Sequence, residues 1–128
     1  MIGTIKIFKD KEDMFKIINN NFEDDDFEMI KRNYPYGKCI GYQGGYYGDG
    51  YVGFASLSVD DEEMHIYTFE ISRKYQAEGY GREFYEDLLE LYKPSLITLD
   101  PLDDEAECFW THIGFKWNNE YEYMYKEI

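Results

Sequence analysis

Hydrophobic positions along the chain follow two spacings, and these separate predicted strands from predicted helices. Short runs rich in β-branched and aromatic residues, most of them alternating with polar residues, predict strands at residues 3–8, 37–43, 51–59, 64–71, 96–99, 115–117 and 121–126. Apolar residues three and four apart predict helices at residues 11–20, 27–32 and 82–92, and between Asp103 and Gly114. This order of elements predicts an α/β fold with a mixed, mostly antiparallel sheet.

Polar residues and glycines mark where several of these elements begin and end. Asp10 and Asp103 each precede a helical segment and are predicted to be N-caps, which accept hydrogen bonds from the first turn of a helix. Asp49-Gly50 predicts a hairpin turn between the strands at 37–43 and 51–59, and the acidic run at 60–63 predicts the next turn. The glycine- and tyrosine-rich residues 44–50 could close over a substrate or could simply be an exposed hairpin tip.

The predicted strand at residues 64–71 carries two side chains with acid–base chemistry. Alternation places its odd-numbered residues on one face and its even-numbered residues on the other. His65 and Glu70 therefore lie on opposite faces, unless a β-bulge shifts the register between them. The sequence leaves both arrangements open.

A glycine-bearing loop, Gln76-Ala77-Glu78-Gly79-Tyr80-Gly81-Arg82, lies between this strand and the helix that follows. Such a junction aims backbone N–H groups and the positive end of a helix at one point, which suits a phosphate. Gly79 and Gly81 can take positive φ and let an anion approach the main chain. Arg73, Lys74 and Arg82 add positive charge, in a chain with 13 basic and 27 acidic residues. The loop has neither the Gly-Lys-Ser/Thr of a Walker A loop nor the third glycine of a dinucleotide-binding loop.

Composition bounds the size and setting of the protein. A chain of 128 residues with 44% hydrophobic content suits one domain over residues 1–128, which can bury a core without disulfides. Two cysteines and the lack of an apolar leader favour a reduced, cytoplasmic setting, and no run of about 18 apolar residues predicts a membrane span. The adjacent Asp24-Asp25-Asp26 lack the spacing of a calcium loop, so no metal site is expected.

The formal net charge of −14 indicates which classes of partner the protein would attract or repel. It argues against nucleic acid and against an anionic membrane surface, because either would be repelled by most of the protein. It favours cationic ligands. The acidity could equally serve only to keep a tyrosine-rich protein soluble.

Two segments resemble the landmarks of a known family. Ile71-Ser72-Arg73-Lys74-Tyr75-Gln76-Ala77-Glu78-Gly79-Tyr80-Gly81 resembles the acetyl-CoA signature of the GNAT N-acetyltransferases, Arg/Gln-x-x-Gly-x-Gly/Ala after an apolar strand end. Ala106-Glu107-Cys108-Phe109-Trp110-Thr111-His112-Ile113-Gly114-Phe115 resembles the family's later helix, which carries Ala-x-x-aromatic-aromatic and closes in Gly-Phe. The resemblance implies a GNAT-type sheet with helices on both faces and direct transfer of an acetyl group from acetyl-CoA to an amine, without a metal. Dimers are frequent in the family, so a homodimer is one option, while the sequence itself does not show the oligomeric state.

The resemblance also implies which residues bind the cosubstrate. In the family, the loop N–H groups hold the pyrophosphate, and the main chain near Phe69 and Ile71 pairs with pantetheine as an extra strand would. The expected acetyl-CoA site comprises Phe69, Ile71, Gln76, Ala77, Glu78, Gly79, Tyr80, Gly81, Arg82, Asp103 and Trp110. Asp103 stands where the family usually has asparagine, and Trp110 stands where many members have the tyrosine that protonates the departing thiolate. An indole N–H cannot serve as that acid.

Deprotonation of the substrate ammonium requires a base. His65 is the first candidate, because it falls where histone-type members of the family carry a catalytic glutamate, and Glu70 is the second. Cys108 is expected to be a core residue. The acceptor is expected to be a small cationic amine, while the departure at Trp110 leaves a non-catalytic acyl-CoA-binding sensor or interaction module as the alternative.

Overall fold

The computed structural model describes residues 3–18, 37–44 and 50–128. They form a seven-stranded sheet in the order β1-β2-β3-β4-β5-β7-β6. The strands are β1 (Thr4–Ile7), β2 (Lys38–Gln43), β3 (Tyr51–Asp60), β4 (Glu63–Ile71), β5 (Leu96–Leu99), β6 (Lys116–Asn118) and β7 (Tyr123–Glu127). The helices are α1 (Lys11–Ile18), α3 (Tyr80–Tyr92) and α4 (Asp104–His112), and η1 (Arg73–Tyr75) is a 3-10 turn. The predicted helix at 27–32 and the hairpin residues 45–49 lie outside the described residues.

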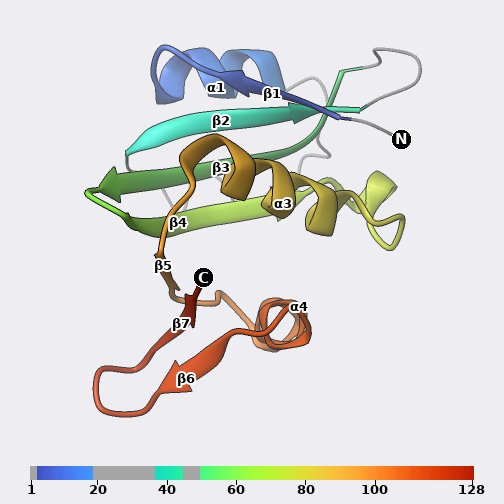
Figure 1. The fold of residues 1–128 in the computed structure, drawn as a ribbon. Coiled ribbons are helices and arrows are strands. Elements are labelled where there is room, and N and C mark those ends of the chain that lie inside the picture. Colours follow the sequence, from blue (N-terminus) through green and yellow to red (C-terminus); the bar gives the residue numbers. More distant parts are fainter. Residues whose placement is uncertain (1–2, 19–36, 45–49) are drawn as a thin grey trace.

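The sheet is mixed, and the predicted fold class is confirmed. Within the described sheet, β4 and β5 pair in parallel, and every other neighbouring pair is antiparallel. The parallel pair needs a crossover, which α3 supplies between β4 and β5. Figure 1 shows α3 in front of β3 and β4.

Helices cover both faces of the sheet. Neighbouring residues of β3 show this, because Phe54 packs with Met14 of α1, whereas Ala55 belongs to the larger core with Phe84 of α3 and Trp110 of α4. The face of the sheet that carries Phe54 is called the α1 face below, and the opposite one the α3 face. The larger core is on the α3 face, so that face fixes the position of both later helices.

A β-bulge interrupts β4 in its middle. Ser56 of β3 pairs with Thr68, but the next residue of β3, Leu57, pairs with Ile66, so Tyr67 is an extra residue on β4. Ile66 packs in the core on the α3 face, and beyond the bulge Phe69 stacks on Phe84 of the same face, with ring centroids 5.0 Å apart. The bulge therefore reverses the alternation, as a bulge does.

The bulge settles the arrangement of the two candidate bases. Before the bulge, odd-numbered residues of β4 point to the α1 face, and His65 is among them. After the bulge, even-numbered residues do, and Glu70 is among them. Strict alternation, which would separate them, does not hold in this strand. Both side chains belong to the α1 face, at different distances along β4.

β4 and β5 are paired along some of their length and then separate. The parallel ladder joins Glu63–Ile66 to Leu96–Leu99 in four residue pairs. β4 continues to Ile71, while the chain after Leu99 turns away toward α4. The β5 side of β4 therefore has no strand partner beyond Ile66 in the described sheet.

The predicted helix caps are present. Asp10 Oδ1 accepts from the N–H of Asp13 at 2.8 Å, and Asp103 Oδ1 accepts from the N–H of Ala106 at 2.7 Å. Each bond satisfies one of the free N–H groups at a helix start. α3 ends at Tyr92, and its C-cap residue, Lys93, adopts a left-handed φ of 47° just before Pro94.

β7 begins later than predicted. Its predicted first residue, Tyr121, lies in the β6–β7 turn, because Asn118 Oδ1 accepts from the N–H groups of Glu120 and Tyr121. A side chain that bonds the backbone two and three residues on replaces strand pairing with a turn. Glu122 then takes a φ of 57° before the strand starts.

Candidate functional site

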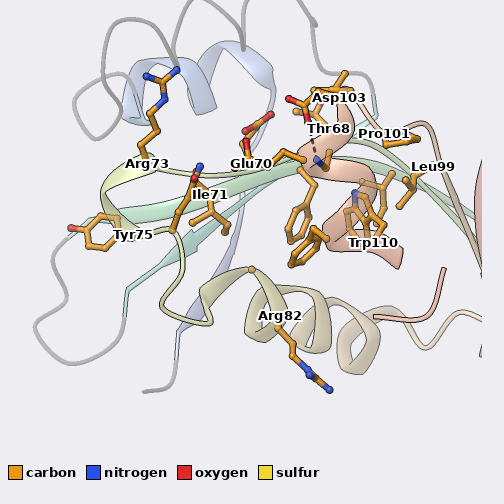
Figure 2. A pocket seen from close by; sticks show the side chains of 18 of the residues that line it. Thr68, Glu70, Ile71, Arg73, Tyr75, Arg82, Leu99, Pro101, Asp103 and Trp110 are labelled. Atoms are coloured by element: carbon orange, nitrogen blue, oxygen red, sulfur yellow. Dashed lines mark hydrogen bonds between the residues drawn. The ribbon is translucent and has the colours of Figure 1, made fainter. Parts of the chain in front are cut away.

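A cavity of about 550 Å³ lies where β4 and β5 part. Its lining comes from three parts of the chain: β4 from Ile66 to Ile71, the turn that leads into α3, and the segment from Leu99 into α4 (Figure 2). The volume suits a small-molecule site. Its place beyond the carboxyl end of β5 is where open α/β sheets bind ligands.

The main chain of β4 presents hydrogen-bonding groups to this cavity. The N–H of Ser72 donates to the carbonyl of Val52 at 2.8 Å, which makes that pair a bonded pair of the β3–β4 ladder. In an antiparallel ladder, bonded and non-bonded pairs alternate. Phe69 and Ile71 are therefore in non-bonded pairs, so their N–H and C=O groups point away from β3, toward the cavity.

A side chain of the turn already uses one of these groups. Gln76 Nε2 donates to the carbonyl of Ile71 at 3.0 Å. The bond ties the turn back to the end of β4. The N–H groups of Phe69 and Ile71, with the carbonyl of Phe69, are the β4 groups that an extended ligand would meet.

The turn between β4 and α3 has the geometry of an anion site. Ala77 and Gly79 have φ values of 64° and 88°, and Gly79 is the N-cap residue of α3. A glycine has no side chain to cap the helix, so the N–H groups of Gly81 and Arg82 face outward at the positive end of α3. The sequence predicts a phosphate site at this same turn, and that assignment stays a prediction.

Gly81 differs from the sequence-based expectation. It lies inside α3 and is not among the residues with positive φ. Glycine gives room at this position, because a Cβ would lie 3.1 Å from the ring of Phe109 of α4, which would have to move by a few tenths of an ångström. Gly81 lets the first turn of α3 approach α4, where both line the cavity.

Most of the predicted cosubstrate residues meet at the cavity, and two do not. Those that line it are Phe69, Ile71, Gln76, Ala77, Gly79, Gly81, Arg82, Asp103 and Trp110. Glu78 is exposed and does not line the cavity, and Tyr80 is buried with its ring edge-on to Tyr75. Burial raises the pKa of the Tyr80 hydroxyl.

The two candidate bases have different positions relative to the cavity. Glu70 lines it. His65 does not, and its Nδ1 lies 2.7 Å from Oγ1 of Thr98, with the ring edge-on to Tyr67. The α1 face is common to both, but Glu70 alone of the two reaches the site.

Charge is divided around the cavity by its origin in the chain. The turn and α3 contribute Arg73 and Arg82, and Arg82 Nε is 3.2 Å from Glu86. β4 and the segment after β5 contribute four carboxylates: Glu70, Asp100, Asp103 and Glu105. The carboxylates of β4 and of the segment after β5 are called the acidic side of the cavity below, although Asp103 also serves as the cap of α4.

Trp110 and Cys108 have contrasting environments on α4. Trp110 is only 4% exposed and packs edge-on against Phe69 and Phe115, with centroid distances of 5.1 Å each. Cys108 is exposed, so the expectation of a core cysteine is wrong. The cause is helical geometry: at about 100° per residue, Cys108 lies on the opposite side of α4 from Trp110.

The structure adds residues to the site that sequence patterns did not single out. They are Thr68 at the bulge, Tyr75 in η1, and Pro101, Leu102, Glu105 and Phe109 around the start of α4. The segment after Leu99 could have been found from the sequence, since it follows the carboxyl end of a parallel strand. Thr68 depends on the bulge, which no residue pattern marks.

Comparison with known proteins agrees with the geometry. The profile of the Acetyltransferase (GNAT) family matches residues 6–115. The chain belongs to this family, which uses acetyl-CoA as cosubstrate. Among curated proteins, none matches the chain significantly.

Three solved structures illustrate the shared fold. Ard1 from Thermoplasma volcanium has 20% identity and a TM-score of 0.65, over 100% of this chain and 99% of that one. A GNAT-family acetyltransferase from Staphylococcus aureus Mu50 has 18% identity and a TM-score of 0.65, over 98% of both chains. AtaTR, solved bound with AcCoA, has 14% identity and a TM-score of 0.66, over 98% of this chain and 93% of that one.

None of the described helices is long and apolar enough to cross a membrane. Across the same parts of the chain, no group of His, Cys, Asp and Glu side chains is arranged to hold a metal ion.

Proposed function

We propose that this acetyltransferase acts on the primary amine of a small cationic molecule. The observation that carries the proposal is the division of charge around the cavity. Arg73 and Arg82 lie beside the turn that suits a pyrophosphate, and the carboxylates lie on β4 and after β5. An anionic cosubstrate and a cationic acceptor would each meet complementary charge in one cavity.

The residues present fit acetyl-CoA. The outward N–H groups at the start of α3 would hold its pyrophosphate, and the free main-chain groups of Phe69 and Ile71 would pair with its pantetheine arm. The cosubstrate supplies an acetyl thioester, which a neutral amine attacks at the carbonyl carbon. Trp110, packed on Phe69, would form the apolar floor at that point.

Glu70 is the residue we propose as base. An alkylamine has a pKa near about 10, so at neutral pH it arrives as an ammonium that cannot attack. Glu70 lines the cavity and can take the proton at its carboxylate, directly or through one water. His65, the first candidate from the sequence, lies outside the cavity and is tested beside it.

A second candidate function is binding without turnover. Trp110 stands where many family members have a tyrosine, and its indole cannot protonate a thiolate. An acyl-CoA sensor would keep the main-chain and turn contacts and would need no base. Turnover separates the two functions.

The first experiment is thermal unfolding with acetyl-CoA, with CoA, ATP and NAD as comparators. A ligand at about a hundredfold excess over its Kd stabilises the folded state by about 2.7 kcal/mol. We expect a shift with the CoA compounds that Arg82→Glu reduces. Lys116→Glu is the matched charge reversal, because Lys116 is exposed and does not line the cavity. The absence of a shift in the unaltered protein would contradict acetyl-CoA binding.

The second experiment measures CoA release with a panel of amines. We expect spermidine, L-lysine and kanamycin to react faster than L-serine and L-glutamate. Glu70→Gln should abolish most of the activity, whereas His65→Ala should keep it. Tight acetyl-CoA binding with no release of CoA on any amine would favour the sensor. Reaction of only neutral or acidic amines would refute the cationic acceptor.

Other expectations stay predictions: a single domain over residues 1–128, a cytoplasmic location, and no nucleic-acid or membrane partner. A homodimer, which is common in the family, stays an open alternative to a monomer. Size-exclusion chromatography with light scattering tests the homodimer directly.

A further inference from the structure

Two buried hydroxyls on the α1 face have no hydrogen-bond partner among the described residues. They are Oγ of Ser56 on β3 and Oγ1 of Thr68 on β4, with the residues 0% and 3% exposed. The two residues are direct partners in the β3–β4 ladder, so their side chains share one face. A buried hydroxyl without a partner costs free energy, and native structures keep few of them.

The two hydroxyls differ in one respect. Thr68 lines the cavity, and Ser56 does not. The difference follows from their strands, because Thr68 lies on β4 where that strand has left β5, whereas Ser56 lies on β3 between β2 and β4. The bulge at Tyr67 sets the face to which Thr68 points. Figure 2 shows Thr68 with Glu70 and Asp103 on the side of the cavity away from α3.

Three consecutive residues of β4 line the cavity and carry three different groups. Thr68 offers a hydroxyl, Phe69 offers an N–H that points to the cavity, and Glu70 offers a carboxylate. An amine that gives a proton to Glu70 keeps two N–H bonds. Each of these N–H groups can donate a hydrogen bond. The nitrogen lone pair points at the thioester carbonyl only when such hydrogen bonds fix the orientation of the amine.

We infer that the Thr68 hydroxyl binds the acceptor amine by accepting a hydrogen bond from one of its N–H groups, so that the nitrogen is oriented beside Glu70. The inference rests on the proposed function, since it concerns the amine of that reaction. It explains why a hydroxyl is buried at the bulge without a partner in the protein.

The test compares two substitutions of Thr68. Thr68→Val removes the hydroxyl and keeps the shape of the side chain, whereas Thr68→Ser keeps the hydroxyl. Ser56→Ala is the matched control, because it removes the neighbouring buried hydroxyl that does not line the cavity. CoA release is measured with the most active amine of the panel above, and amine and acetyl-CoA are varied separately.

We expect Thr68→Val to lower kcat/KM for the amine about tenfold through a higher KM, the effect of about one lost hydrogen bond. The KM for acetyl-CoA stays the same, Thr68→Ser recovers most of the loss, and Ser56→Ala matches the unaltered protein. Equal kinetics for Thr68→Val and Ser56→Ala would overturn the inference and leave the proposed function standing. A loss of acetyl-CoA affinity in Thr68→Val would also overturn it. An unaltered protein that binds acetyl-CoA and acetylates no amine overturns both.

Discussion

Ala77 has a backbone conformation that residues with a Cβ rarely adopt, with a φ of 64°. Two residues later Gly79 has a φ of 88°, where a glycine meets no such penalty. Both residues shape the turn that presents the N–H groups at the start of α3. The turn is thus partly strained and partly relaxed, and the two positions should respond oppositely to substitution.

Ala77→Gly should raise the free energy of unfolding by about 0.5 kcal/mol, because it relieves the left-handed conformation but also loosens the unfolded chain. Gly79→Ala should lower it by about 1 kcal/mol. An added Cβ at Gly79 meets nothing within 4 Å, so that loss reports the backbone alone. Urea unfolding measures both. Equal stability of the two variants would contradict the assignment of strain.

The hydroxyl of Tyr85 is buried without a hydrogen-bond partner among the described residues. Burial raises its pKa from 10.0 to about 12, with a smaller contribution from Glu86. A raised pKa in the folded state means that the unfolded chain loses its proton first as pH rises. The stability that the neutral hydroxyl retains is therefore complete below pH 10 and is lost up to about pH 12.

Tyr85→Phe should stabilise the protein by about 1 kcal/mol at neutral pH, because it removes a buried, unpaired hydroxyl. Its advantage should grow as pH rises above 10, where the phenol of the unfolded chain ionises. Thermal unfolding across this pH range measures the effect. Tyr121→Phe is the control, since Tyr121 is 69% exposed and should change neither quantity. A destabilised Tyr85→Phe would show that the hydroxyl has a partner.

At the scale of elements, α4 combines a structural role with a role at the cavity. Its N-cap residue, Asp103, accepts a hydrogen bond from the N–H of Ala106 at 2.7 Å and also lines the cavity. The cap was predictable from the sequence, because a carboxylate before a helical segment has one common purpose. Its contribution to the acidic side of the cavity was not predictable from that pattern.

Asp103 allows the two roles to be separated. Asp103→Ala should lower the free energy of unfolding by about 1 kcal/mol, whereas Asp103→Ser keeps a capping oxygen and should lose much less. Both remove the charge, so both should raise the KM for a cationic amine about equally. Denaturation and steady-state kinetics on the same variants give the answer. If Asp103→Ala raised the KM for the amine and Asp103→Ser did not, KM would follow stability instead of charge, and Asp103 would act only as a cap.

The strands and helices show where sequence reasoning succeeds. The strand at residues 96–99, the cap at Asp10 and the end of α3 before Pro94 were all predicted, because each rests on local chemistry. The bulge at Tyr67 was not, since it depends on how β3 and β4 pair and leaves no mark in the residue types. Spacing also could not show that Gly81 is needed for room beside Phe109. The positions of His65 and Thr68 relative to the cavity follow from the bulge, so they required the structure.

At the scale of the whole molecule, the net charge of −14 produces a long-range field. This field attracts cations, including the cationic acceptor proposed above, and repels the anionic cosubstrate, whose binding we therefore expect to depend on the local arginines and N–H groups. The two substrates should therefore respond to salt in opposite directions.

Between about 0.01 M and about 0.1 M salt, the Debye length falls from about 30 Å to about 10 Å. We expect kcat/KM for spermidine to fall over this range, and more steeply than for a monocationic amine such as L-serine amide. The KM for acetyl-CoA should stay level or improve. Initial rates at constant pH measure both. A rise in kcat/KM for spermidine with salt would contradict attraction by the field.

The short ladder between β4 and β5 has a mechanical consequence. Four residue pairs join the strands, and β4 then extends five residues beyond Ile66 to Ile71. At about 3.3 Å per residue, that extension is a lever about 17 Å long. A rotation of about 4° at the ladder would change the width of the opening at Ile71 by about 1 Å. The width of the opening in which a ligand would lie can thus be changed by residues of the β4–β5 ladder, such as Thr98, which does not line the cavity.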